Sequence, residues 1–185
     1  SLEEEVKKLL EELKKVADKL TKEVREADKK LEEVLRRVKR RLDEVDRRLE
    51  EEIKKVKSRI TDERLRRRLD ELLERVREHS KRLKERLDKI LEDVNRRTKE
   101  MEERLRRIVK EVEELVEEVK RRKSDREELL ERLKRRIDRL IEEARRLVEK
   151  WRDELKKLID EVRKLVEDHE RKVRDIEKKV RDESR

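Results

Sequence analysis

The fold is decided by residues 65–119, which read LRRRLDELLERVREHSKRLKERLDKILEDVNRRTKEMEERLRRIVKEVEELVEEV. Apolar side chains recur along this stretch every three or four residues, at positions 65, 69, 72, 76, 83, 87, 90, 94, 101, 105, 108, 112, 115 and 119. Two polar residues, His79 and Thr98, occupy the two positions where this apolar spacing would otherwise continue. This spacing is the signature of an amphipathic helix, so one long helix is predicted here.

The segments before and after this stretch, residues 2–60 and 129–180, repeat the same apolar pattern. Their mean spacing is close to the ~3.6 residues of an α-helical turn. A left-handed coiled coil requires a spacing of about 3.5, and a right-handed one about 3.67. The intermediate value therefore predicts nearly straight helices, each of roughly 57–60 residues.

Two short stretches interrupt the pattern, Thr61-Asp62-Glu63 and Ser124-Asp125-Arg126-Glu127. Thr61 and Ser124 are good N-cap residues, and Ser124 with Glu127 fits a capping box. Basic residues precede each break and acidic residues follow it, as the helix dipole favours. The predicted helices are residues 2–59, 62–122 and 125–183. One unbroken helix through the first break is the alternative, because no glycine marks a helix end there.

Folding the chain at these breaks brings unusual residues together. In two antiparallel helices, the position numbers of facing residues have a constant sum. If Val56 of the first helix faces Leu65 of the second, this sum is 121, and Leu2 then faces Val119. For facing residues of the second and third helices, the corresponding sum of position numbers is 248.

With these values Val24, Thr98 and Trp151 share one layer, and Leu42 joins the chain's two histidines, His79 and His169, in another. The coincidences predict an all-α fold, a single-chain antiparallel up-down-up three-helix bundle forming one domain over residues 1–185.

Composition excludes several classes of function. The chain contains no Gly, Pro or Cys, so it has no glycine-rich phosphate loop, no thiol nucleophile, no thiolate zinc site and no disulfide. Charged residues make up 63% of the chain, and the net charge of +9 is evenly spread. Nucleic-acid binders concentrate such an excess on one face. We therefore expect no cofactor, no nucleic-acid partner and no membrane partner. No targeting signal follows Ser1, so the localisation is undetermined.

The two histidines are the main candidate site. Both rings are expected to be desolvated inside the bundle, which would disfavour their charged forms. A buried polar layer that fixes the register is the favoured interpretation, because misregistered pairings would bury an unmatched polar group. A pH-responsive element and a metal site at His79 and His169 are the alternatives. Zinc requires three or four protein ligands, and Leu42 occupies the third place in this layer.

Thr98 and Trp151 are predicted as buried polar positions as well. A buried indole N–H needs an acceptor, and Thr98 or Asn95 is expected to provide it. Ser80 neighbours His79, but adjacent helix positions do not face each other. No catalytic residue, no cofactor-binding residue and no enzymatic activity are therefore predicted.

Two basic runs, residues 36–41 and 120–123, resemble nuclear-localisation or phosphate-binding patches. The second run lies at a predicted helix C-terminus, where cations are favourable in any case. Solvated surface is the simpler interpretation of both runs.

The capped breaks, the Leu/Ile/Val core and the Glu/Lys/Arg surface together resemble a de novo designed, parametrically generated three-helix bundle. The resemblance covers the whole chain and implies idealised helices, high stability and no evolved activity. Spectrin-like repeats and exchangeable apolipoproteins are less similar, since the former have shorter helices and the latter contain proline. A monomeric structural scaffold is expected, and a domain-swapped dimer is the alternative assembly. Other functions considered are a rod-like interaction or spacer module, a lipid-surface protein and a pH- or metal-responsive design.

Overall fold

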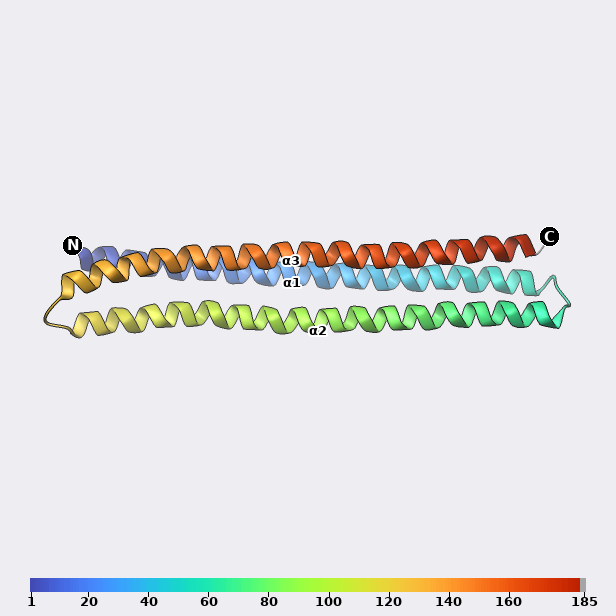
Figure 1. Cartoon of the computed structure of the whole chain (residues 1–185), viewed down its shortest axis with the longest axis horizontal. Coiled ribbons are helices and arrows are strands. Elements are labelled where there is room, and N and C mark those ends of the chain that lie inside the picture. The colour runs from blue at the N-terminus through green and yellow to red at the C-terminus, as the bar shows by residue number, and fades with distance from the viewer. Residues whose placement is uncertain (184–185) are drawn as a thin grey trace. The chain divides into compact units, whose positions relative to one another are not determined.

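The computed structural model describes residues 1–183, and residues 184 and 185, which the predicted bundle also included, lie outside the described residues. The chain forms α1 (Leu2–Lys57), α2 (Glu63–Arg121) and α3 (Arg126–Glu183), of 56, 59 and 58 residues (Figure 1). No strand occurs within residues 1–183. The predicted all-α three-helix bundle is confirmed, and the helix lengths are within a few residues of those expected.

The helices are divided between two compact units. The first unit comprises Ser1–Lys30 and Val94–Lys156, and the second comprises Leu31–Asp93 and Lys157–Arg185. Each unit contains a segment of all three helices, and each is described by itself below. That residues 1–185 form a single domain stays a prediction.

The core of the first unit is aliphatic. Its buried residues are Val6, Leu13, Val112, Val116, Val119, Leu130, Leu133, Ile137 and Ile141. Leu2 and Val119, which were expected to face each other, both belong to this core. Burying one such side chain contributes about 1.5–3 kcal/mol, so this stripe is the main source of stability in the unit.

The core of the second unit is built in the same way. Its buried residues are Leu49, Ile53, Val56, Leu69, Leu73, Val76, Val173 and Val180. Half-buried Val45, Ile60 and Ile176 pack against them. Because all three helices contribute to both cores, each helix uses its single apolar face to contact two neighbours.

Most ion pairs between α1 and its two neighbours flank the apolar faces at recurring offsets. In six ion pairs between α1 and α2, the two position numbers add up to 127. These pairs are Lys14–Glu113, Arg25–Glu102, Lys39–Asp88, Asp43–Lys84, Glu50–Arg77 and Lys57–Asp70. Four ion pairs join the parallel helices α1 and α3 at residues whose position numbers differ by 129. They are Glu5–Lys134, Glu23–Arg152, Arg41–Glu170 and Glu52–Arg181.

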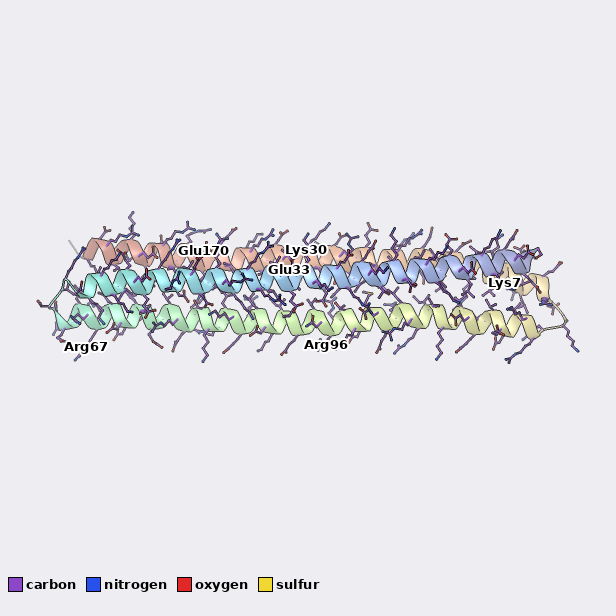
Figure 2. All side chains as sticks on the ribbon, turned by 180° about the vertical axis from the view of Figure 1, so that it is seen from behind. Lys7, Lys30, Glu33, Arg67, Arg96 and Glu170 are labelled. Carbon is purple, nitrogen blue, oxygen red and sulfur yellow. The ribbon has the colours of Figure 1, made fainter. Side chains whose placement is uncertain are left out.

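Figure 2 shows charged side chains projecting from all three helices, among them Lys7 and Arg67. Exposed pairs contribute only about 0–1 kcal/mol each, so their regular placement bears on register more than on stability.

The first connection shows how a helix ends without glycine. The Arg66 guanidinium donates to the carbonyl oxygens of Lys57, at 3.2 Å, and Ile60, at 3.4 Å. These bonds satisfy two carbonyl groups near the helix end that no later helical N–H reaches, and α1 and α2 are separate helices ending at Lys57 and starting at Glu63. The alternative of one unbroken helix through this region is therefore wrong.

The predicted N-caps are each displaced by one residue. Asp62 caps α2 in place of Thr61, because the Asp62 Oδ1 accepts the backbone N–H of Arg64 at 3.0 Å. In the second connection α3 starts after Asp125, whose φ of 60° is left-handed. Aspartate tolerates this conformation better than most residues. Ser124 therefore lies outside the cap position that its sequence context suggested.

Substitution of the α2 N-cap tests this correction. Asp62→Ala is expected to lower the free energy of unfolding by about 1 kcal/mol, because it leaves the Arg64 N–H without its acceptor. Thr61→Ala is the matched control and is expected to change stability by only a few tenths of that amount. Guanidinium denaturation followed by circular dichroism provides the measurement. Equal losses in the two variants would contradict the assignment of Asp62 as the cap.

Candidate functional site

A histidine cluster lies in the second unit and consists of Asp46, His79, Ser80 and His169. Asp46 comes from α1, His79 and Ser80 from α2, and His169 from α3. The two histidines therefore meet between α2 and α3, as the predicted pairing of these helices requires.

The two imidazole rings are hydrogen-bonded edge to edge. Their Nδ1 atoms are 2.9 Å apart, their planes differ by 6°, and their centroids are 5.1 Å apart. Rings stacked face to face would keep their atoms about 3.5 Å or more apart. The shorter approach between nearly parallel rings therefore requires an in-plane N–H···N bond, with a hydrogen on one Nδ1 and a lone pair on the other.

The opposite nitrogen of His169 decides which ring donates. His169 Nε2 lies 3.1 Å from the Asp46 Oδ1 and 3.0 Å from the Ser80 Oγ. An ionised carboxylate only accepts hydrogen bonds, so Nε2 carries the hydrogen and donates it to Asp46. In this tautomer the His169 Nδ1 is the acceptor, and the His79 Nδ1–H donates to it. The tautomers of both rings are thus assigned from their hydrogen-bond partners.

The burial of the two histidines differs from the prediction. His169 is buried, with 2% of its surface exposed, but His79 is exposed and Ser80 is buried instead. Positions 79 and 80 lie three and four residues after Val76, and helical spacing allows either to point inward. The small Ser80 side chain fits beside the His169 ring. The expectation that both rings are desolvated is therefore wrong for His79, whose ring only reaches the cluster with its Nδ1 edge.

His79 nevertheless has a shifted protonation equilibrium. Desolvation of its covered edge is the largest cause that lowers the His79 pKa from its usual 6.5. His169, Lys172 and Arg82 lower it further, and Asp46 opposes them. The lowered pKa favours the neutral form of His79. A second proton in the pair would also place two N–H groups against each other, at the cost of the bond between the rings.

Ser80 contacts His169, a contact that the sequence argument about its neighbour His79 did not consider. A serine nucleophile needs an adjacent lone pair to take its proton. The nearest nitrogen, His169 Nε2, carries a hydrogen directed at Asp46, so it has no lone pair to offer. In this tautomer Ser80 accepts a share of that hydrogen bond.

Glu170, labelled in Figure 2, is a buried charge that sequence reasoning missed. Its carboxylate pairs with Arg41 of α1 and with Arg174 of α3, the latter at 3.3 Å. A signal was present, because Glu170 follows Val166 by four residues and so continues a flanking apolar column. Two guanidinium groups compensate the buried charge, as a buried carboxylate requires.

The predicted polar layer in the first unit is buried but only partly satisfied. Thr98 is 4% exposed and Trp151 is 2% exposed, while the Thr98 Oγ1 and the Trp151 Nε1 have no hydrogen-bond partner among the described residues. Asn95 donates to both carboxylate oxygens of Asp28, at 2.9 and 3.1 Å, when its amide nitrogen faces them. The expectation that Thr98 or Asn95 accepts the indole N–H is therefore wrong.

The Trp151 ring has a cationic neighbour instead of a hydrogen-bond acceptor. The Arg97 guanidinium carbon lies 4.5 Å from the ring centroid, and Arg97 also pairs with Glu154 at 2.7 Å. A cation over an aromatic face contributes about 0.5–1 kcal/mol at an exposed site. This contact covers the ring but leaves its N–H unpaired.

The basic runs carry acidic partners. In the first run Arg36 pairs with Glu32 and Lys39 with Asp88. In the second, Lys120 pairs with Glu117. These pairs favour the interpretation of both runs as solvated surface.

Among the described residues, no group of three or more His, Cys, Asp or Glu side chains is arranged to hold a metal ion. His79 and His169 direct their Nδ1 atoms at each other, and Asp46 contacts the far nitrogen of His169. The metal hypothesis therefore lacks a convergent ligand set. Within residues 1–183, no helix is both long enough and apolar enough to cross a membrane.

Comparison with known proteins adds no relative to this description. No family model matches the chain, and neither a curated protein nor a solved structure matches it.

The buried Thr98 hydroxyl, which has no hydrogen-bond partner among the described residues, leads to a prediction about stability. Thr98→Val replaces the buried hydroxyl with a methyl group and is expected to raise the free energy of unfolding by about 1 kcal/mol, because no hydrogen bond is lost. Thr98→Ala removes a methyl group as well as the hydroxyl and serves as the control, with a smaller gain or a loss. Guanidinium midpoints measure both. A destabilised Thr98→Val variant would show that the hydroxyl has a partner.

The lowered His79 pKa predicts a pH-dependent stability. As pH falls below about 6.5, the unfolded chain takes up the His79 proton before the folded chain does. This contribution to stability is therefore present above that value and is lost as pH falls toward the folded pKa. The parent should lose more stability than His79→Gln between roughly pH 7.5 and pH 4.5. An equal loss in guanidinium denaturation would show that His79 has no shifted pKa.

Proposed function

We propose that the chain is a designed structural scaffold without an evolved biochemical activity. The recurring offset of most ion pairs made by α1 carries this proposal. The values of 127 between α1 and α2, and of 129 between α1 and α3, recur in both units. Such uniform pairing beside an aliphatic core matches the surface and core rules of idealised helical bundles.

The surface supports a scaffold more than an interaction module. The described residues include no large hydrophobic side chain that is exposed. Binding surfaces on soluble proteins usually present a contiguous apolar patch of several hundred Å². A rod-like interaction or spacer module therefore remains the alternative function, and it would have to recognise partners through charged side chains alone.

A lipid-surface function would require the bundle to open. Its apolar faces are covered in both units, and exposing them would forfeit the burial that holds each unit together. Flotation with phospholipid vesicles separates this function from the scaffold, because the scaffold stays in the protein fraction.

Thermal denaturation and mass determination test the scaffold directly. We expect a monomer with the chain mass of 23.2 kDa at micromolar concentration, and a helical circular dichroism signal that persists above about 90 °C. Both follow from aliphatic faces that are already covered within one chain. A dimer mass would support domain swapping through the short, stiff connections. An unfolding midpoint of about 45–65 °C would contradict the expected high stability.

A further inference from the structure

The histidine cluster contains the three parts of an activated nucleophile. Such sites place a nucleophile within hydrogen-bond reach of a base, and a third group orients the base. Here the His79 Nδ1–H donates to the His169 Nδ1 at 2.9 Å, and the His169 Nε2–H donates to Asp46 at 3.1 Å. The remaining His79 nitrogen, Nε2, then holds a free lone pair.

The exposure of the rings suits these roles. His79 is exposed, and the ring nitrogen that contacts His169 is Nδ1, which leaves Nε2 for a small molecule in solution. His169 is 2% exposed, and Asp46 is largely buried, with 16% of its side chain exposed. The base and its orienting carboxylate are therefore held in place, while the nucleophile faces solvent.

We propose that His79 is an acyl-accepting nucleophilic site for activated carboxylic esters. His169 acts as its proton acceptor, and Asp46 is a positioning residue that stabilises the imidazolium form of His169. The site goes beyond the scaffold function, and neither proposal depends on the other.

The acylation step balances within the cluster. The His79 Nε2 attacks the carbonyl carbon of p-nitrophenyl acetate, a C–N bond forms, and p-nitrophenolate leaves with the electron pair of the broken C–O bond. The proton on the His79 Nδ1 passes to the His169 Nδ1. His169 is then an imidazolium ion whose Nε2–H still donates to the Asp46 carboxylate, an interaction that favours its positive charge.

Water completes the turnover. It attacks the acetyl carbon, the C–N bond breaks, and its electron pair returns to the His79 Nε2. The proton held by His169 moves back to the His79 Nδ1, acetic acid is released, and the second proton of water passes to solvent. The cluster returns to its starting protonation state, so no other reactant is consumed.

Two cations near His79 favour the same reaction. Lys172 of α3 and Arg82 of α2 act on His79 through their positive charge. A tetrahedral intermediate carries a negative oxygen, which nearby cations stabilise. The same charges help to keep His79 unprotonated at pH 7, so its lone pair is available for attack.

The decisive test is the rate of p-nitrophenolate release from p-nitrophenyl acetate by the full chain, corrected for the reaction of buffer. His79→Gln is expected to lower this rate about tenfold, since it removes the nucleophile at an exposed position that does not disturb the core. An unchanged rate would overturn the proposal. Ser80→Ala addresses the competing nucleophile, because a loss of activity in that variant alone would assign the reaction to Ser80 and overturn the assignment to His79.

The pH–rate profile tests the roles of His169 and Asp46. The rate should rise as His79 loses its proton, with a midpoint below the usual value of about 6.5. Asp46→Asn removes the one neighbour that raises the His79 pKa, so the midpoint should move to lower pH while the rate falls. His169→Gln removes a neighbour that lowers the pKa, so the midpoint should move upward as the rate falls.

These opposite shifts separate a proton relay from a structural role. Loss of structure would release His79 into solvent and move the midpoint upward in both variants. Circular dichroism and guanidinium midpoints establish that each variant is folded. Midpoints that move upward together, or rates that match the parent in both variants, would overturn the assigned roles.

Discussion

Burial of one aliphatic face on each helix is the interaction on which the other features depend. Charged residues make up 63% of the chain, and a sequence with so much charge folds only if its apolar third is gathered into continuous stripes. In each unit the stripes of α1, α2 and α3 meet in one core. Once this face is buried, flanking charges on neighbouring helices lie at preferred offsets, which accounts for the repeated values of 127 and 129.

Helix existence and pairing were predictable because they follow from spacing repeated along the whole chain. Residues with a single decisive contact were harder to place. Asp62 and Thr61 are both good caps, and only the bond to the Arg64 N–H distinguishes them. His79 and Ser80 both lie at positions that helical spacing allows to point inward. Which of them does so depends on the size of the His169 ring across the layer, a property of another helix that spacing alone does not encode.

The contacts of buried polar groups were also not predictable from the spacing of apolar residues. Glu170 was missed because the apolar pattern does not show its compensating partners. Arg41 lies on α1, and Arg174 lies one helical turn after Glu170 on α3. Asp46 was missed for a similar reason, since its role appears only when α1 lies beside His169. A pattern of apolar positions reports which residues are buried, but the identity of a hydrogen-bond partner depends on atomic distances between helices.

The two polar layers differ in how completely they are satisfied, and this difference decides what each does. In the first unit the Thr98 hydroxyl and the Trp151 N–H are both buried without partners, so that layer costs stability and holds no proton in a defined place. In the second unit the hydrogen bonds run from His79 through His169 to Asp46. The Asp46 carboxylate at one end favours the tautomers in which His169 donates from Nε2 and His79 donates from Nδ1. A connected network of this kind can specify register and position a reactive lone pair at the same time.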